Sequence, residues 1–139
     1  MFRKIIRTDD SKTTLIIRLM VGTVFFSEGI QKFLYPLTNG AGRFETIGLP
    51  WPEFFGPFVG VFEIICGALI LIGLITRLAA VPTLIIMMVA ILTTKIPMLN
   101  NSGFWEMAHA ARTDWAMLLG SLFLLIKGGG GLSFDRYLR

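Results

Sequence analysis

The chain has 139 residues, of which 54% are hydrophobic and 16% charged, and its mean hydropathy is +0.71. A soluble domain carries about a quarter charged residues, so the composition predicts one compact integral membrane domain over residues 1–139. The net charge of +4 lies at the ends of apolar segments, which excludes a nucleic-acid partner, and a single Cys and a single His exclude an iron–sulfur centre, a Cys-based metal site and a bis-His haem.

Four apolar segments have, or approach, the roughly 20 residues that a membrane-spanning helix needs. They lie at residues 14–34, 54–75, 78–96 and 112–131 and predict an all-α, antiparallel four-helix bundle. The fourth is the weakest, because its purely apolar part covers only residues 115–126. The first segment is interrupted by Arg18, Glu28 and Lys32 and is not followed by a small-residue cleavage site, so it is expected to stay in the mature protein rather than to be a signal peptide.

Prolines and glycines mark the expected helix ends. Pro36 ends the first helix, and Pro57 and Pro82 fit the first turns of the second and third helices, where a missing N–H costs little. Pro97 is expected to stop the third helix, and the glycine run at residues 128–131 to stop the fourth.

The distribution of Lys and Arg predicts the orientation in the membrane. The side with both termini carries nine: Arg3, Lys4, Arg7, Lys12, Arg18, Arg77, Lys127, Arg136 and Arg139. The opposite side carries four: Lys32, Arg43, Lys95 and Arg112. Cytoplasmic termini in a bacterial inner membrane are therefore expected.

Two carboxylates interrupt the apolar segments, Glu28 in the first and Glu63 in the second. An ionisable group at membrane depth is costly, so it is expected to have a partner or a task. A helix rises about 1.5 Å per residue, which puts Glu28 roughly 21 Å and Glu63 roughly 18 Å from the inner ends of their helices, at one level in the outer half of the membrane. Lys32 lies one turn beyond Glu28, within reach of it.

Helical spacing predicts where Glu63 points. Gly56, Gly60, Glu63 and Gly67 share one face of the second helix, and membrane helices approach closely along stripes of small residues. Glu63 is therefore expected to face the inside of the bundle.

These residues together predict a pocket in the outer half of the membrane. Its expected members are Glu28, Lys32 and Glu63, with Asp114, Arg112 and His109 at the mouth and Phe25, Phe26, Phe58 and Phe62 as apolar lining.

Several of these residues also have a purely structural interpretation. Glu28 and Lys32 can form an ion pair that only stabilises packing, whereas Glu63 has no partner on its own helix, which favours a functional or docking role. Arg18 is expected to snorkel to the membrane surface. His109 fits an ordinary surface residue as well as a proton carrier.

The order of several short motifs resembles a known family. The motifs are Arg18, Gly22, Phe26, Gly29, Lys32 and Phe33 in the first helix, Gly60-x-x-Glu63-x-x-x-Gly67 in the second, Leu71–Leu74 and Thr76–Ala80 around the turn, Gly48–Pro50 before the second helix, and Gly131-Leu132-Ser133-Phe134-Asp135 at the end. In this order and spacing the chain resembles the DoxX family from about Arg18 to Asp135.

The resemblance implies a four-helix membrane bundle and an association with quinone-linked redox systems. It also implies that Glu63, Lys32, Arg18 and Arg77 are the polar residues of the family pattern. The segment before the fourth helix, with Glu106, matches no family pattern.

Three functions remain open at this stage. In the first, the protein is a quinone- or quinol-binding redox component: Glu63, Glu28 and Lys32 carry the proton chemistry, and Glu63, Lys32, Phe26, Phe62, His109 and Asp114 contact the quinone. In the second, it is a non-catalytic accessory subunit of a larger membrane complex, or a homo-oligomer. The third, a small-solute or proton carrier, is disfavoured because the chain lacks an inverted repeat. No metal, haem or iron–sulfur centre is expected, and whether the chain is itself an enzyme stays open.

Overall fold

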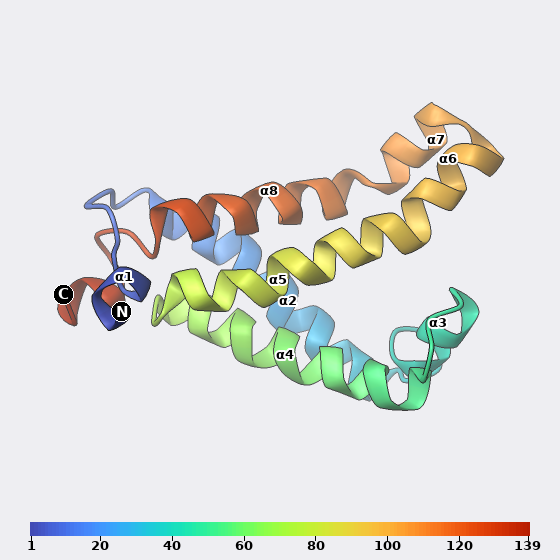
Figure 1. Ribbon diagram of the computed structural model, residues 1–139, viewed down its shortest axis with the longest axis horizontal. Coiled ribbons are helices and arrows are strands. Elements are labelled where there is room, and N and C mark those ends of the chain that lie inside the picture. Colours follow the sequence, from blue (N-terminus) through green and yellow to red (C-terminus); the bar gives the residue numbers. More distant parts are fainter.

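The computed structural model describes residues 1–139 and consists of helices and connecting turns without strands (Figure 1). The helices are α1 Phe2–Ile5, α2 Thr14–Leu34, α3 Ala41–Thr46, α4 Pro52–Ile72, α5 Thr76–Ala90, the π-helical turn η1 Ile91–Lys95, α6 Ile96–Ser102, α7 Phe104–Ala110, α8 Arg112–Lys127 and α9 Phe134–Tyr137.

Three helical stretches are long and apolar enough to cross a membrane. They are α2 and α4, with 21 residues each, and the continuous run of 27 residues from Thr76 to Ser102 through α5, η1 and α6. The prediction of an all-helical membrane protein is confirmed. Helix α8 has 16 residues, so its crossing of the membrane, and the side on which the termini lie, stay predictions.

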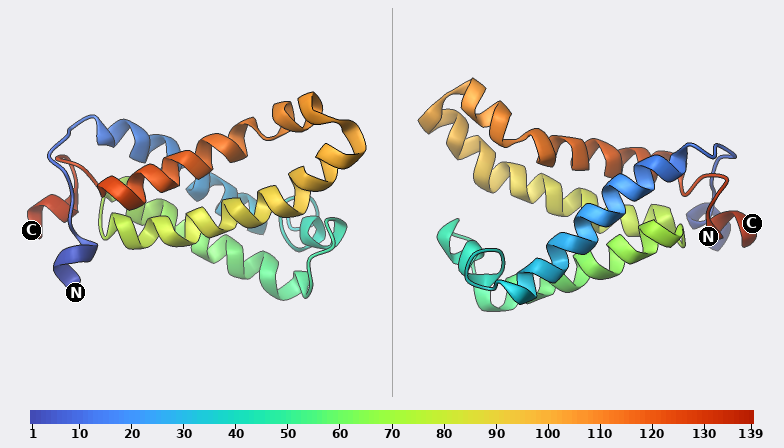
Figure 2. Two further views of the ribbon diagram at one scale, coloured as in Figure 1. Left: turned by 45° about the horizontal axis from the view of Figure 1, so that its top comes forward. Right: turned by 180° about the vertical axis from the view of Figure 1, so that it is seen from behind.

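The long helices form two pairs. Helix α2 packs along α4 and α5 along α8, whereas α4 meets α5 and α2 meets α8 over shorter stretches. Figures 1 and 2 show both chain ends at one end of the molecule and α3, α6 and α7 at the other, with α4 and α5 diverging toward that far end. The buried core between the helices consists of Val21, Phe25, Cys66, Ile70, Ala79, Ala80, Met117 and Leu124.

Glycines bring α2 and α4 into backbone contact. A Cβ added at Gly29 would lie 2.7 Å from the carbonyl oxygen of Gly60, and one added at Gly67 would lie 2.6 Å from the backbone nitrogen of Phe26. No larger residue fits these positions without moving a helix. The predicted small-residue contact is thus confirmed, and it buries Glu63 to 2% exposure.

Arg18 links the helices at the end that holds the termini. Its side chain is buried, and its guanidinium donates to Ile70 O at 2.8 Å and Leu71 O at 2.5 Å, in the last turn of α4, where carbonyls lack partners within the helix. It also donates to Gly129 O and Leu132 O in the loop after α8. The expectation that Arg18 snorkels to the surface is therefore wrong, because these carbonyls need donors that lipid does not supply.

Asp135 caps the start of α5 from the far end of the sequence. Its buried carboxylate accepts hydrogen bonds from the N–H groups of Ile75 at 2.6 Å and Thr76 at 2.9 Å, and its own N–H donates to Gly73 O at 2.8 Å. An anionic group at a helix N-terminus satisfies N–H groups that the helix leaves unpaired and interacts favourably with the helix dipole. The C-terminal segment is therefore part of the α4–α5 turn.

Several helix ends differ from the predicted boundaries. Helix α4 runs over residues 52–72 rather than 54–75, α5 begins at residue 76 rather than 78, and α8 ends at residue 127 rather than 131. Gly73, with φ +74° and ψ 37°, adopts the left-handed conformation that ends many helices, and Gly128, with φ +82° and ψ −160°, ends α8 in a different conformation that also favours glycine. Gly73 also has no space for a side chain, because a Cβ there would lie 2.7 Å from Cζ of Arg18.

The prediction that the third helix stops at Pro97 is wrong, because the helical run continues beyond this residue. It continues through η1, where hydrogen bonds join residues five apart, and Pro97 lies in the first turn of α6, where no N–H is needed. Pro57 and Pro82 lie inside α4 and α5 rather than in their first turns, because these helices begin at Pro52 and Thr76.

Replacing Arg18 with Gln is expected to lower the free energy of unfolding by about 3 kcal/mol or more, since the shorter amide leaves several buried carbonyls without donors. The lone buried thiol, Cys66, provides the measurement: its labelling by a maleimide dye on heating in detergent reports unfolding. Lys12→Gln, which removes an exposed charge near the start of α2, is the control and should keep the wild-type midpoint. Equal midpoints for Arg18→Gln and wild type would contradict this role of Arg18.

Candidate functional site

A cleft of about 960 Å³ is lined by residues of both the α2–α4 pair and the α5–α8 pair and by the segment around α3. Figure 1 shows α3 at the end of the molecule away from the chain termini. The walls of the cleft come from α2, α4, α5, η1 and α8, and the segment from Thr38 to Pro50 around α3 closes one side. More than half of the lining residues are hydrophobic, among them Phe25, Phe58 and Phe62. The polar and charged lining residues are Glu28, Lys32, Thr38, Asn39, Arg43, Glu63, Thr93, Thr94, Lys95, Thr113 and Asp114.

Lys32 and Glu63 form a buried ion pair between α2 and α4. Nζ of Lys32 lies 2.8 Å from Oε2 of Glu63, and their side chains are 10% and 3% exposed. Glu63 accepts no hydrogen bond from any other side chain or backbone N–H, so Lys32 alone compensates its charge. Gly60 lets α2 approach α4 beside this pair, because a Cβ there would lie 2.9 Å from Cε2 of Phe33 and 3.3 Å from Cβ of Lys32.

Glu28 lines the same cleft without an ion-pair partner. The sequence places it one turn from Lys32, but the Lys32 ammonium is turned toward α4 and pairs with Glu63 instead. Glu28 is exposed to the open space of the cleft. The structure therefore brings Glu28, Lys32 and Glu63 into one cleft, but Lys32 pairs with Glu63 and not with Glu28, its neighbour on the same helix.

A second ion pair lies on the opposite wall of the cleft. Nζ of Lys95 in η1 lies 3.0 Å from Oδ2 of Asp114 in the first turn of α8, and the two side chains are 12% and 22% exposed. Sequence reasoning placed Asp114 near Lys32 and did not find Lys95 as its partner. The signal was present, because Lys95 is a lone cation at the end of an apolar run and Asp114 begins the next long apolar segment.

Three of the predicted pocket residues lie outside the cleft. Phe26 packs its backbone against Gly67 of α4, so Phe25, one position away, provides the aromatic surface of α2. His109 and Arg112 are exposed beyond the mouth, where Nη1 of Arg112 donates to His109 O at 2.6 Å. Neither residue lines the cleft.

The chain matches the DoxX family over residues 13–96, the part that contains α2, α4, α5 and η1. The chain belongs to the DoxX family. A DoxX-like membrane protein of Mycobacterium tuberculosis named "Uncharacterized membrane protein Rv3486" is 52% identical to it over 141 aligned residues, which cover 97% of this chain and 86% of that protein.

A more distant relative has a name that refers to redox chemistry. "Putative oxidoreductase CatD" of Bacillus subtilis is 31% identical over 126 residues, covering 89% of this DoxX-family chain and 85% of the relative. No solved structure matches the chain significantly.

Removing one partner of the buried pair is expected to destabilise this DoxX-family protein more than removing both. Lys32→Met leaves a buried carboxylate and Glu63→Gln leaves a buried ammonium, so each single change should cost up to about 3–5 kcal/mol. The double variant should recover a large part of that loss. The measurement is a double-mutant cycle on the midpoint of Cys66 labelling. Additive losses would mean that the two side chains do not interact.

Proposed function

We propose that this DoxX-family protein binds a quinone or quinol in the cleft and acts as a component of a quinone-linked redox system. The observation that carries the proposal is the arrangement of the cleft, in which the buried Lys32–Glu63 pair and the half-buried Lys95–Asp114 pair lie on opposite walls of a space lined mainly by apolar side chains. The name of the Bacillus subtilis relative, "Putative oxidoreductase CatD", also supports a redox function.

The residues present fit a quinone in size and in chemistry. A volume of about 960 Å³ suits a ring with part of an apolar tail, and ligand sites of this kind combine apolar walls with a few polar groups. Phe58 and Phe62 offer flat apolar surface on α4. Lys32 can donate a hydrogen bond to a ring oxygen of the quinone. Lipid tails offer no such donor.

Glu63 and Glu28 are the carboxylates on the α2–α4 wall of the cleft that can hold a proton. A bound quinone supplies the two-electron, two-proton chemistry, and the chain supplies orientation and proton acceptors. Glu63 is shielded from water and held by Lys32, whereas Glu28 faces the open cleft, so Glu28 is placed to exchange protons between Glu63 and the cleft mouth. Lys95 and Asp114 form a second polar contact on the other wall.

Electrons come from a partner or from another bound molecule, because one Cys and one His provide no ligand set for a protein-borne redox centre. The proposal therefore includes a larger membrane redox complex. An accessory subunit that binds no quinone is the competing function, and in that case the intramembrane charges only hold the helices and the partner in place.

The arrangement in the membrane is part of the proposal: four crossing helices, cytoplasmic termini and a bacterial inner membrane. Helix α8 is about 24 Å long at 1.5 Å per residue, close to the hydrocarbon thickness, and Arg112 and Lys127 at its two ends can reach the head groups. The excess of Lys and Arg on the side of the termini favours the cytoplasm.

Glu63→Gln is expected to remove at least about nine-tenths of the bound quinone, because it breaks the charged pair that orients Lys32. Native mass spectrometry of protein extracted from its own membrane in mild detergent measures the bound quinone directly. Glu53→Gln, an exposed carboxylate in the first turn of the same helix that does not line the cleft, is the matched control and should keep the quinone.

The midpoint of Cys66 labelling shows whether each variant is folded. Wild-type quinone occupancy in folded Glu63→Gln would exclude Glu63 from the site. Co-purified proteins without any quinone would instead support the accessory subunit.

A further inference from the structure

A pocket of about 360 Å³ lies at the opposite end of the molecule from the cleft and belongs to the two chain termini. Its lining consists of Arg3, Ile6, Arg7 and Arg139, so three of its four residues carry a guanidinium group. The proposed quinone function uses none of these residues.

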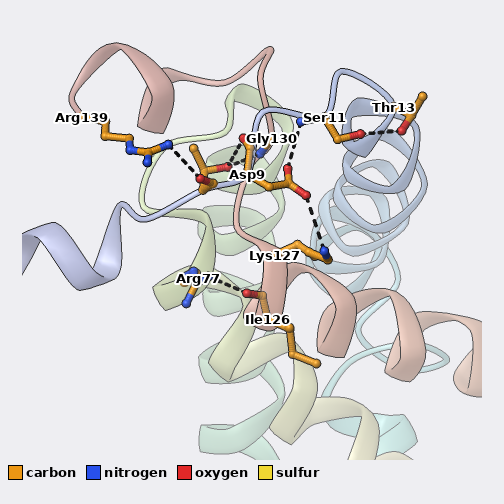
Figure 3. A network of polar contacts seen from close by, with 9 residues as sticks. Asp9, Ser11, Thr13, Arg77, Ile126, Lys127, Gly130 and Arg139 are labelled. Atoms are coloured by element: carbon orange, nitrogen blue, oxygen red, sulfur yellow. Dashed lines mark hydrogen bonds and ion pairs between the residues drawn. The ribbon is translucent and has the colours of Figure 1, made fainter.

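The pocket is anchored to the membrane helices. Ile6, between the two N-terminal arginines, is 2% exposed, and α1 lies against α5. The next residues are held at the end of α8, because Thr8 accepts a hydrogen bond from the N–H of Gly130 and the N–H of Asp9 donates to Lys127 O at 3.2 Å. Figure 3 shows the Asp9 carboxylate beside the ammonium group of Lys127. The arginines are thus held at one end of the bundle.

The cations of the pocket are incompletely neutralised. Arg3 and Arg7 have no acidic partner. Nη1 of Arg139 lies 3.7 Å from Oδ1 of Asp10, a carboxylate that also pairs with Arg136. Arg139 also donates to the carbonyl oxygen of Thr8 at 3.2 Å (Figure 3). Residues 1–12 and 127–139 together carry seven Lys and Arg against three Asp. A ligand for this pocket is therefore an anion, and planar guanidinium groups suit phosphate oxygens.

The position of the pocket favours a lipid over a soluble anion. Helix α2 begins and α8 ends at this level, so the pocket lies where the membrane helices meet the head groups. Met1 and Phe2, beside Arg3, are exposed apolar residues, and apolar side chains next to cations are the pattern of a segment that lies on an anionic membrane surface.

We propose that Arg3, Arg7 and Arg139 bind the phosphate of an anionic phospholipid in the leaflet next to the chain termini. The phosphate lies against the guanidinium groups, and the acyl chains run along the lipid-facing surface of the bundle. A guanidinium that donates directly to the phosphate contributes about tenfold or more to binding, so the loss of two should weaken binding by well over tenfold, whereas a cation that does not touch the phosphate contributes little in detergent.

The test compares two doubly substituted full-length chains that each lose two positive charges from the same segment. The variant Arg3→Gln/Arg7→Gln removes cations that line the pocket, and Lys4→Gln/Lys12→Gln removes cations that do not. Each protein is equilibrated in detergent with phosphatidylglycerol and phosphatidylcholine, and native mass spectrometry measures the retained lipid. The midpoint of Cys66 labelling verifies that both variants are folded.

Wild type should retain phosphatidylglycerol in preference to phosphatidylcholine. The arginine variant should lose this preference by at least about tenfold, and the lysine variant by less than about threefold. If both variants lost the same preference for phosphatidylglycerol, the total charge of the segment and not this pocket would bind the lipid. If wild type showed no preference, the proposal would be wrong. Displacement of phosphatidylglycerol by inorganic phosphate at equal concentration would show a free-phosphate site instead.

Discussion

The packing of this protein depends on one guanidinium group. Arg18 of α2 satisfies carbonyls at the end of α4 and in the loop after α8, so three distant parts of the sequence converge on a single side chain. A lipid environment offers these carbonyls no alternative donor, which makes the convergence obligatory rather than merely favourable. Asp135 and Gly73 complete the arrangement, because the carboxylate caps α5 and the glycine leaves the space that Arg18 occupies.

The cleft lies at the end of the molecule that the contacts of Arg18 and Asp135 do not reach. The helices are fastened together at the end with the termini, whereas at the other end each pair of helices has its own ion pair, Lys32–Glu63 for α2 with α4 and Lys95–Asp114 for η1 with α8. No ion pair crosses the space between the two pairs of helices. The charges that membrane burial makes expensive are therefore neutralised within each wall, and the surface between the walls is mainly apolar.

The fold was largely predictable from the sequence, because hydropathy and small-residue spacing act within one helix and can be counted. The inward direction of Glu63 followed in this way from its glycine stripe. The errors concern choices between helices. Arg18 looked like a surface cation because its acceptors are backbone carbonyls, which leave no trace in the residue types. Lys32 had two carboxylates within reach, and which of them it pairs with depends on how α2 lies against α4, a relation between helices that spacing within one helix does not give. The helical run passes Pro97 directly after a π-helical turn, which residue propensities do not reveal.

That π-helical turn has a geometric consequence for the cleft wall. A π-helical turn holds about one residue more than an α-helical turn, so it acts like a single-residue insertion in the helical run. Every side chain beyond it is rotated by roughly 100° from the direction that an unbroken α-helix would give. Lys95 is the last residue of this turn, so the additional residue helps to set the direction of the side chain that pairs with Asp114. The distance along the chain between Thr76 and Lys95 is therefore as much a part of the site as the identity of the lysine.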